Sequence, residues 1–343
     1  MDAITRIKQL GMPRRNNELW TFFPVNKIPN VLSADGDCRV ADAPRNDVID
    51  APRNDEQEAL DFSKEEDFAA LLPIAKAAPL MKKVFAAGET EMGIIKSRND
   101  FAHSQFIIEK GAKVSLEILD NKVMHEICAE RFDILVDEGA ELEIFFANPA
   151  NDLPLTFRHF DIKQAANSTV RFANVLQDSG IGRISARVEL NGEGANFDYR
   201  SLNILKGNAS KHQRLTIQHN APSTVSTQFV RNILDENAYT SYDGQVIVGN
   251  NCSQVNSSQL VNTILLSDGP SVSVKPVLKI YHDDVECTHG NTVGELDKDQ
   301  MFYLTSRGIP ADKARAMLTK AFAKELFQEL PEGPAKKRLM QVI

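Results

Sequence analysis

A repeat with a period near 28 residues constrains the fold of this chain more than any other feature of its sequence. Apolar landmarks that follow small or polar corner residues occur at positions 114, 142, 170, 197 and 225, spaced by 28, 28, 27 and 28. Between the corners, apolar and polar residues alternate, as in Val114–Ile118 and Leu142–Ile144, which is typical of β-strands. Self-similarity of this kind indicates a solenoid, in which the strands of one coil pair with those of the next.

The sequence therefore predicts a mainly β fold, a right-handed parallel β-helix, over residues 91–294. Residues 1–90 predict a helical and irregular N-terminal region, with a short helix near 67–77 and a surface loop at 43–55, where the pentapeptide APRND occurs twice. Residues 295–343 predict a C-terminal helical domain. Its apolar residues recur every three or four positions and comprise Ala314, Met317, Leu318, Ala321, Phe322, Leu326 and Leu330. Because a solenoid exposes unpaired strand edges at its ends, we expect these helices to act as its cap.

The candidate chemistry lies in the segment VECTHGNTVGELD, residues 285–297, where Cys287 and His289 are two positions apart. In a β-strand such side chains share a face and their Cα atoms are roughly 6–7 Å apart. A thiolate and an imidazole at that separation suit iron, zinc or copper better than magnesium or calcium. Spacing alone favours a structural interior face instead, because Val285 has the same parity and free cysteine commonly packs as a small hydrophobe. His282, five residues before Cys287, precedes two acidic residues that we expect to form a turn between coils.

Composition and the absence of motifs exclude several function classes. A formal net charge of −8 argues against nucleic-acid binding, and no apolar run reaches the ~20 residues of a membrane span. Four scattered cysteines without a C-x-x-C pair favour neither a disulfide framework nor a four-cysteine cluster. The sequence contains no G-x-x-x-x-G-K-[ST] phosphate loop, so any ATP dependence must come from a partner. With no secretory signal at the N-terminus, a reducing cytoplasm is the expected location.

The C-terminal third resembles a known family. The run LDKDQMFYLTSRGI at 296–309, followed by ARAML at 314–318 and KAFAKE at 320–325, is similar to the C-terminal part of the SufB/SufD scaffold proteins of the SUF iron–sulfur cluster assembly system. The G-x-P and E-x-W elements at residues 11–13 and 18–20 resemble the N-terminal signature of the family. Gly290 after His289 is typical of the SufD branch, whereas SufB members tend to carry His-Glu there.

This resemblance implies a scaffold subunit without catalytic activity of its own. It implies a β-helix paired with a SufB-like subunit, a SufC-like ATPase beneath the helical domains, and transient assembly of iron and sulfide at the scaffold interface. Carried onto this sequence, the interface histidine and cysteine are His289 and Cys287. The helical residues that would dock the ATPase are Met317, Leu318, Phe322 and Leu326. A flavin is associated with the complex at family level, but no residue here locates it.

Three other interpretations stay open at this stage. A SufB-like role within the same family is disfavoured by Gly290 and by the shortage of cysteines. A stand-alone β-helical metalloprotein would use His282, Cys287 and His289. A β-helical carbohydrate-active enzyme would need clustered carboxylates or basic residues on one face, which the sequence does not show.

Overall fold

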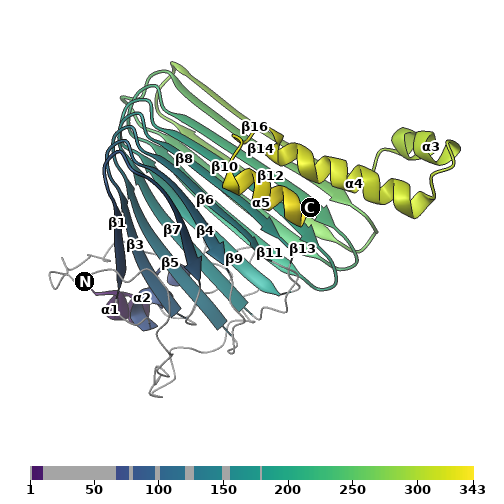
Figure 1. Cartoon of the computed structure of the whole chain (residues 1–343), viewed down its shortest axis with the longest axis horizontal. Helices are drawn as coiled ribbons and strands as arrows, with labels where there is room; N and C mark the ends of the chain where they lie inside the picture. The colour runs from purple at the N-terminus through teal and green to yellow at the C-terminus, as the bar shows by residue number, and fades with distance from the viewer. Residues whose placement is uncertain are drawn as a thin grey trace.

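The chain folds into two parallel β-sheets that stack face to face, with helices on their outer faces (Figure 1). The computed structural model describes residues 2–10, 67–76, 80–96, 101–119, 127–148, 155–177 and 180–343. The doubled pentapeptide at 43–55, Trp20 and the rest of the N-terminal signature lie outside these residues.

Odd- and even-numbered strands form separate eight-stranded sheets, so the chain alternates between the two sheets as it advances. Sheet A contains β1 (Met81–Phe85), β3 (Phe101–Ile108), β5 (Ile127–Val136), β7 (Leu155–Gln164), β9 (Ile181–Leu190), β11 (Ser210–His219), β13 (Tyr239–Val248) and β15 (Ser271–Ile280). Sheet B contains β2 (Thr90–Lys96), β4 (Lys113–Leu119), β6 (Glu141–Asn148), β8 (Thr169–Leu176), β10 (Asn196–Leu205), β12 (Val225–Leu234), β14 (Val255–Leu265) and β16 (Val285–Gly294). The predicted parallel β-helix is confirmed. It begins at Met81 rather than at residue 91, because β1 already pairs in parallel with β3.

The corners of the coils explain the repeat. A tight turn precedes the even strands, and from β4 to β12 its corner residue has a positive φ, which favours glycine and is tolerated by Asn. These five corners are Gly111, Gly139, Asn167, Gly194 and Ser223, with φ between 53° and 71°. The inward row that follows them runs Val114, Leu142, Val170, Phe197, in register from strand to strand. The next member is Ser226 and not the expected Val225, because Phe197 pairs with Ser226.

The interior changes character along the solenoid. In the first coils it is aromatic, with the rings of Phe132 and Phe160 stacked at 4.8 Å and Phe160 edge-on to Phe172 at 4.6 Å. In the later coils buried polar side chains form rows, and Asn203 donates to Asn232, which in turn donates to Thr263. Aromatic rows anchor the fold by burying a large apolar area. Fully satisfied polar rows hold the coils in register.

Each end of the solenoid is finished differently. At the first coil Lys83 and Glu91 form an ion pair at inward positions, and the Lys83 ammonium lies 4.3 Å from the centre of the Phe85 ring. At the last coil β15 and β16 are the edge strands of the two sheets, and no strand of the described chain covers them. The inward residues of β16 other than Val285 and Cys287 are exposed.

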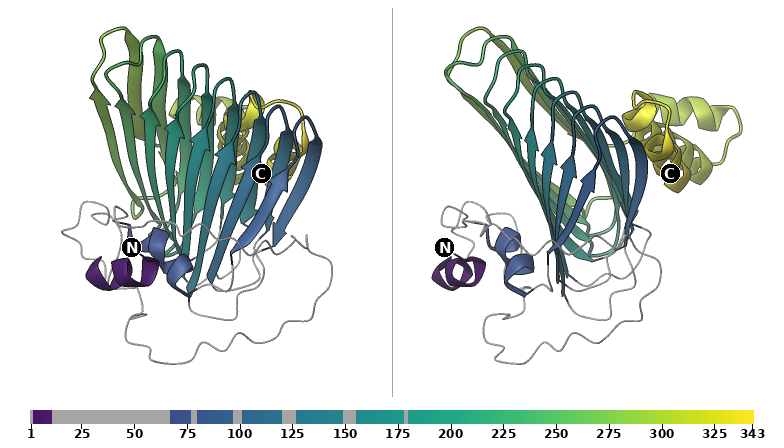
Figure 2. Two further views of the ribbon diagram at one scale, coloured as in Figure 1. Left: turned by 90° about the vertical axis from the view of Figure 1, so that its left-hand side faces the viewer. Right: turned by 60° about the vertical axis from the view of Figure 1, so that its left-hand side comes forward.

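The C-terminal helices are α3 (Lys298–Ser306), α4 (Ala311–Gln328) and α5 (Pro334–Val342). Helices α4 and α5 lie against the outer face of sheet B, chiefly over β4 to β12, which corrects the expectation of a cap (Figures 1 and 2). Apolar outward residues of the even strands pack against the second half of α4 and against α5; they include Phe145, Ala147, Ala173, Val175, Leu202 and Ile233. Arg200 adds a hydrogen bond of 2.8 Å to the Leu326 carbonyl. The helices therefore bury a side of the solenoid and leave its end open.

Two N-terminal helices lie on the other side of the molecule (Figure 2). They are α1 (Ala3–Leu10) and α2 (Phe68–Lys76), and the second confirms the short helix predicted near 67–77. Leu71 and Leu72 of α2 belong to an apolar cluster with the first residues of β5 and β7. The outer face of sheet A is thus partly covered by helices, as is the outer face of sheet B.

Truncating Leu326 to alanine should loosen α4 from sheet B, because Leu326 is 4% exposed within this packing. We expect the helix docking to weaken by about 2–4 kcal/mol. Hydrogen exchange of α4 amides should speed up about 30- to 1,000-fold while exchange in the strands is unchanged. Met317→Ala, at an exposed position of the same helix, should leave both unaltered. Unchanged exchange in Leu326→Ala would show that this residue does not hold the helix.

Candidate metal site at the open end of the solenoid

Cys287 and His289 lie on β16, the last strand of sheet B. Their partners in register are Ser257 and Gln259 of β14, both of which are buried inside the solenoid. Cys287 and His289 therefore occupy inward positions of a coil that has no following coil in the described chain. The structure brings the two predicted residues to one face, roughly 6–7 Å apart along the strand. On the preceding strands the same face points into the interior of the solenoid. On β16 this face is partly exposed, because β16 is the last strand of the sheet.

The two side chains differ in their surroundings. Cys287 is half-buried and packs against the apolar cluster of Val246, Val248, Cys252 and Val255. This burial raises the pKa of the Cys287 thiol above its ordinary value. His289 is exposed, one step further along the strand. A divalent metal could displace the thiol proton and bind both residues, because metal ions compete with protons for thiolate ligands.

Two ligands are fewer than the four that iron–sulfur and zinc sites ordinarily take. Within the described residues, no three His, Cys, Asp or Glu side chains lie together in a way that could hold a metal ion. His282 is in the connection between β15 and β16, where its Nδ1 accepts the Asp284 N–H at 3.1 Å. In the described chain, His282 therefore does not join Cys287 and His289 as a third metal ligand.

The remaining described histidines lie on strands of sheet A and are held by hydrogen bonds. His159 contacts Ser185 at 2.8 Å, His212 contacts Ser241 at 2.8 Å, and His219 contacts Thr224 at 2.7 Å. Burial lowers the pKa of His219 to about 4 and that of His212 to about 3, so both are neutral at physiological pH. His125 lies outside the described residues. The four described histidines of sheet A, which are His103, His159, His212 and His219, all lie away from the open end.

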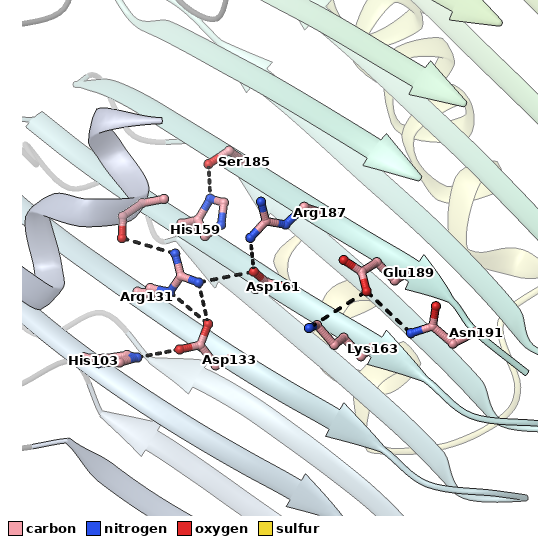
Figure 3. A network of polar contacts seen from close by, with 11 residues as sticks. His103, Arg131, Asp133, His159, Asp161, Lys163, Ser185, Arg187, Glu189 and Asn191 are labelled. Atoms are coloured by element: carbon pink, nitrogen blue, oxygen red, sulfur yellow. Dashed lines mark hydrogen bonds and ion pairs between the residues drawn. The ribbon is translucent and has the colours of Figure 1, made fainter. Parts of the chain in front are cut away.

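A charged network on the outer face of sheet A was not anticipated from the sequence (Figure 3). Arg131 bonds Asp133 at 2.8 Å and Asp161 at 3.2 Å, and Arg187 also bonds Asp161. Arg131 reaches the Ala70 carbonyl of α2 at 3.4 Å, which ties the helix to the sheet. The sequence did contain a signal for this network. Charged residues recur at outward positions of successive odd strands that pair in register. We interpret this network as structural.

The four residues expected to dock a partner fall into two groups. Leu326 is buried against sheet B, and Phe322 is partly buried there with the Arg231 guanidinium 4.5 Å from its ring. Leu318 is half-buried, and Met317 is exposed. The freely exposed apolar surface lies instead on α3, which has no buried residues and projects away from both sheets (Figure 1). Phe302 is 73% exposed and Tyr303 53% exposed.

Comparison with known proteins decides the family. Residues 93–322 match the model of the SufBD core domain of the SUF system for FeS cluster assembly, which is more than half of the chain. This chain belongs to the SufB/SufD family. It is 31% identical over 210 residues to the iron–sulfur cluster assembly protein SufD of Escherichia coli, which covers 61% of this chain and 50% of the relative. A SufBD family protein of Synechocystis is 31% identical over 182 residues, covering 53% and 40%.

Other SufB/SufD relatives agree on the branch. The SufD protein of Bacillus subtilis is 26% identical over 177 residues, covering 52% of this chain and 40% of the relative. The chain thus spans about half the length, or less, of these relatives. Within the family it is SufD-like, as Gly290 suggested. None of the helices in the described ranges is long and apolar enough to cross a membrane.

Proposed function

We propose that this chain is a SufD-like scaffold subunit that pairs with a SufB-like subunit through the open end of its solenoid. His289 and Cys287 then contribute ligands to iron and sulfide, which are the substrates assembled at the shared interface. One observation carries the proposal: the pair of soft and borderline metal ligands lies at inward positions of β16, an edge strand that no further strand of the described chain covers. We further propose that the chain is not itself catalytic and works in the cytoplasm.

The two ends differ in how they discourage strand pairing. Inward charges, lysines and prolines on edge strands are devices against association with other sheets. The first coil carries the inward pair Lys83 and Glu91. At the last coil, β15 carries Pro276 between Lys275 and Lys279, whereas β16 has no lysine, arginine or proline. We therefore assign the pairing strand to β16, where a partner strand would add to the unpaired edge.

The chemistry of the site suits temporary binding. Thiolate and imidazole ligands suit iron, and the partner subunit would complete the coordination sphere across the interface. Cys287 would lose its proton as iron binds, and His289 would bind through a neutral ring nitrogen. A site divided between two chains can open again when the chains move apart. Incomplete coordination in each chain is thus consistent with a scaffold that must release its cluster.

The exposed apolar residues of α3 and α4 support a docking surface for an ATPase partner. We propose that a SufC-like ATPase docks on α3 and the first half of α4, where Phe302, Tyr303 and Met317 are exposed. Aromatic and methionine side chains are enriched in protein interfaces and are costly to leave in water. ATP hydrolysis would take place on that partner. The flavin associated with the family is assigned to no residue of this chain and is not part of the proposal.

Replacing Phe302 with glutamate should weaken ATPase docking without unfolding the chain, because the side chain is exposed and makes no core contact. We expect the affinity for the ATPase to fall about 10- to 100-fold, as for a central aromatic of an interface. Titration calorimetry or pull-down with the ATPase subunit would measure it. Leu135→Glu, at an exposed apolar position of sheet A, is the matched control. Equal affinities for wild type and Phe302→Glu would exclude α3 from the docking surface.

Co-expression with SufB-like and SufC-like subunits tests the proposal as a whole. A stable three-component complex that contains this chain would support it. A chain that stays alone and holds stoichiometric metal would instead indicate an independent metalloprotein. Size-exclusion chromatography with mass determination and metal analysis distinguishes these outcomes.

A further inference from the structure

Gln259 lies inside the solenoid, directly next to His289 in the row that runs along the axis. It is 2% exposed on β14, and His289 is its partner in register on β16. Both polar atoms of the Gln259 amide are buried without a hydrogen-bond partner among the described residues. An amide in that situation normally destabilises the fold, because it has lost its hydrogen bonds to water without replacing them. Its presence therefore requires a compensating interaction.

Neighbours in register elsewhere in this solenoid bond to each other. Asn203 and Asn232 are joined at 2.6 Å, and the hydroxyls of Ser226 and Ser257 at 2.8 Å. Both pairs are matched across adjacent strands in the same way as Gln259 and His289. Side chains paired in register can therefore bond from coil to coil in this fold. Gln259 and His289 are paired in register without such a bond in the described chain, where His289 is exposed at the end of the solenoid.

We propose that Gln259 is a positioning residue for His289, an inference that rests on the proposed function. Its amide oxygen accepts the N–H of one imidazole nitrogen when the end of the solenoid is covered. The ring is then fixed in one tautomer, and the lone pair of the other nitrogen is directed at the metal. Histidine ligands generally donate their second N–H to a carbonyl or carboxylate in this way, which sets ring orientation and raises ligand basicity.

The row beneath Gln259 is compatible with this role. Tyr242 donates its hydroxyl proton to the Oε1 atom of Gln228, and burial raises the pKa of Tyr242 well above its ordinary value, so the phenol stays a donor. Gln228 is therefore held with its amide nitrogen free to donate, and Gln228 is the register partner of Gln259. A carbonyl oxygen has two lone pairs, so the Gln259 oxygen can accept from Gln228 and from His289 together.

The test measures Co²⁺ affinity and the Co²⁺ absorption spectrum of the complex between the full chain and its SufB-like partner. Gln259→Met keeps the volume and removes the amide, and it should not destabilise the fold because the amide is unsatisfied there. We expect Co²⁺ affinity to fall about 10- to 100-fold, the usual effect of losing such a partner. Gln259→Glu restores an acceptor oxygen and should restore affinity and spectrum.

Thr263→Val is the matched control, since it removes a buried hydrogen bond from β14 at a position paired with Val293 instead of His289. Its Co²⁺ affinity should equal that of the wild type. Wild-type affinity in Gln259→Met, an equal loss in Thr263→Val, or no recovery in Gln259→Glu would each overturn the inference. His289→Ala separates this from the proposed function: if it leaves Co²⁺ binding unchanged, the ligand role fails, and the positioning role fails with it.

Discussion

Replacing His289 with alanine should reduce cluster formation by the assembled complex to background while the complex itself remains intact. The side chain is exposed at the end of the solenoid and makes no described hydrogen bond, so its loss should change stability by less than about 0.5 kcal/mol. What it removes is one of the two metal ligands that we propose for this chain. Iron and acid-labile sulfide in the purified complex, with its visible absorption spectrum, would measure cluster content.

His282→Ala is the appropriate control for this variant. His282 is half-buried, lies just before β16, and accepts a hydrogen bond from the Asp284 N–H. It should leave cluster content and complex size at wild-type values. Normal cluster loading in His289→Ala would contradict the ligand assignment. Equal loss in both variants would mean that the connection between β15 and β16 matters and not the imidazole of His289.

The fold could be predicted because the repeat is a direct consequence of its geometry. The coils from β4 to β12 have a left-handed corner before the even strand, and the corners Gly139, Asn167 and Gly194 are recognisable in the sequence. The period also fixes which residues share an inward row. For the strand after Phe197, the period predicted Val225 as the inward residue, whereas the structure has Ser226 there. The reason is that the coil between Phe197 and Ser226 is longer than the earlier ones. Spacing alone does not reveal where a coil gains a residue.

The position of the C-terminal helices was predicted incorrectly for a physical reason. An amphipathic stripe shows that a helix buries one side, but it does not identify the surface that covers it. The information was in the strands: residues 145–147 read Phe-Phe-Ala, so β6 is apolar on both faces and must be covered on both. The outward apolar residues Val175 and Leu202 continue the same surface. Reading both faces of the even strands would have placed the helices on sheet B.

The site was only partly accessible from the sequence. Strand parity placed Cys287 and His289 on one face and allowed that face to be interior. Parity does not reveal that the inward residues of β16 are exposed to solvent. Their exposure depends on β16 being the last strand of the sheet and on the C-terminal helices packing against the outer face of sheet B and not over its end. Nor could it identify Gln259, whose pairing with His289 follows from a register that spans the whole coil between β14 and β16.

Introducing a lysine at Val293 should prevent pairing with the SufB-like subunit while leaving this chain folded. Val293 occupies an inward position at the open end of β16 and is 49% exposed, so the new charge is solvated in the free chain. In the complex it would be buried without a partner, which is unfavourable by several kcal/mol. We expect the affinity between the two scaffold subunits to fall at least about 100-fold, or ~2.8 kcal/mol. Size-exclusion chromatography and biolayer interferometry with the partner would measure this.

Val84→Lys separates an effect of the open end from a general effect of added charge. Val84 is 46% exposed on β1, at the opposite end of the solenoid, where the inward ion pair of Lys83 and Glu91 already discourages strand pairing. The same substitution there should leave the affinity unchanged. If Val84→Lys abolishes pairing and Val293→Lys does not, the subunits meet through the first coil. Cys287 and His289 would then lie at the far end from the partner, and a cluster site shared between the chains would be impossible.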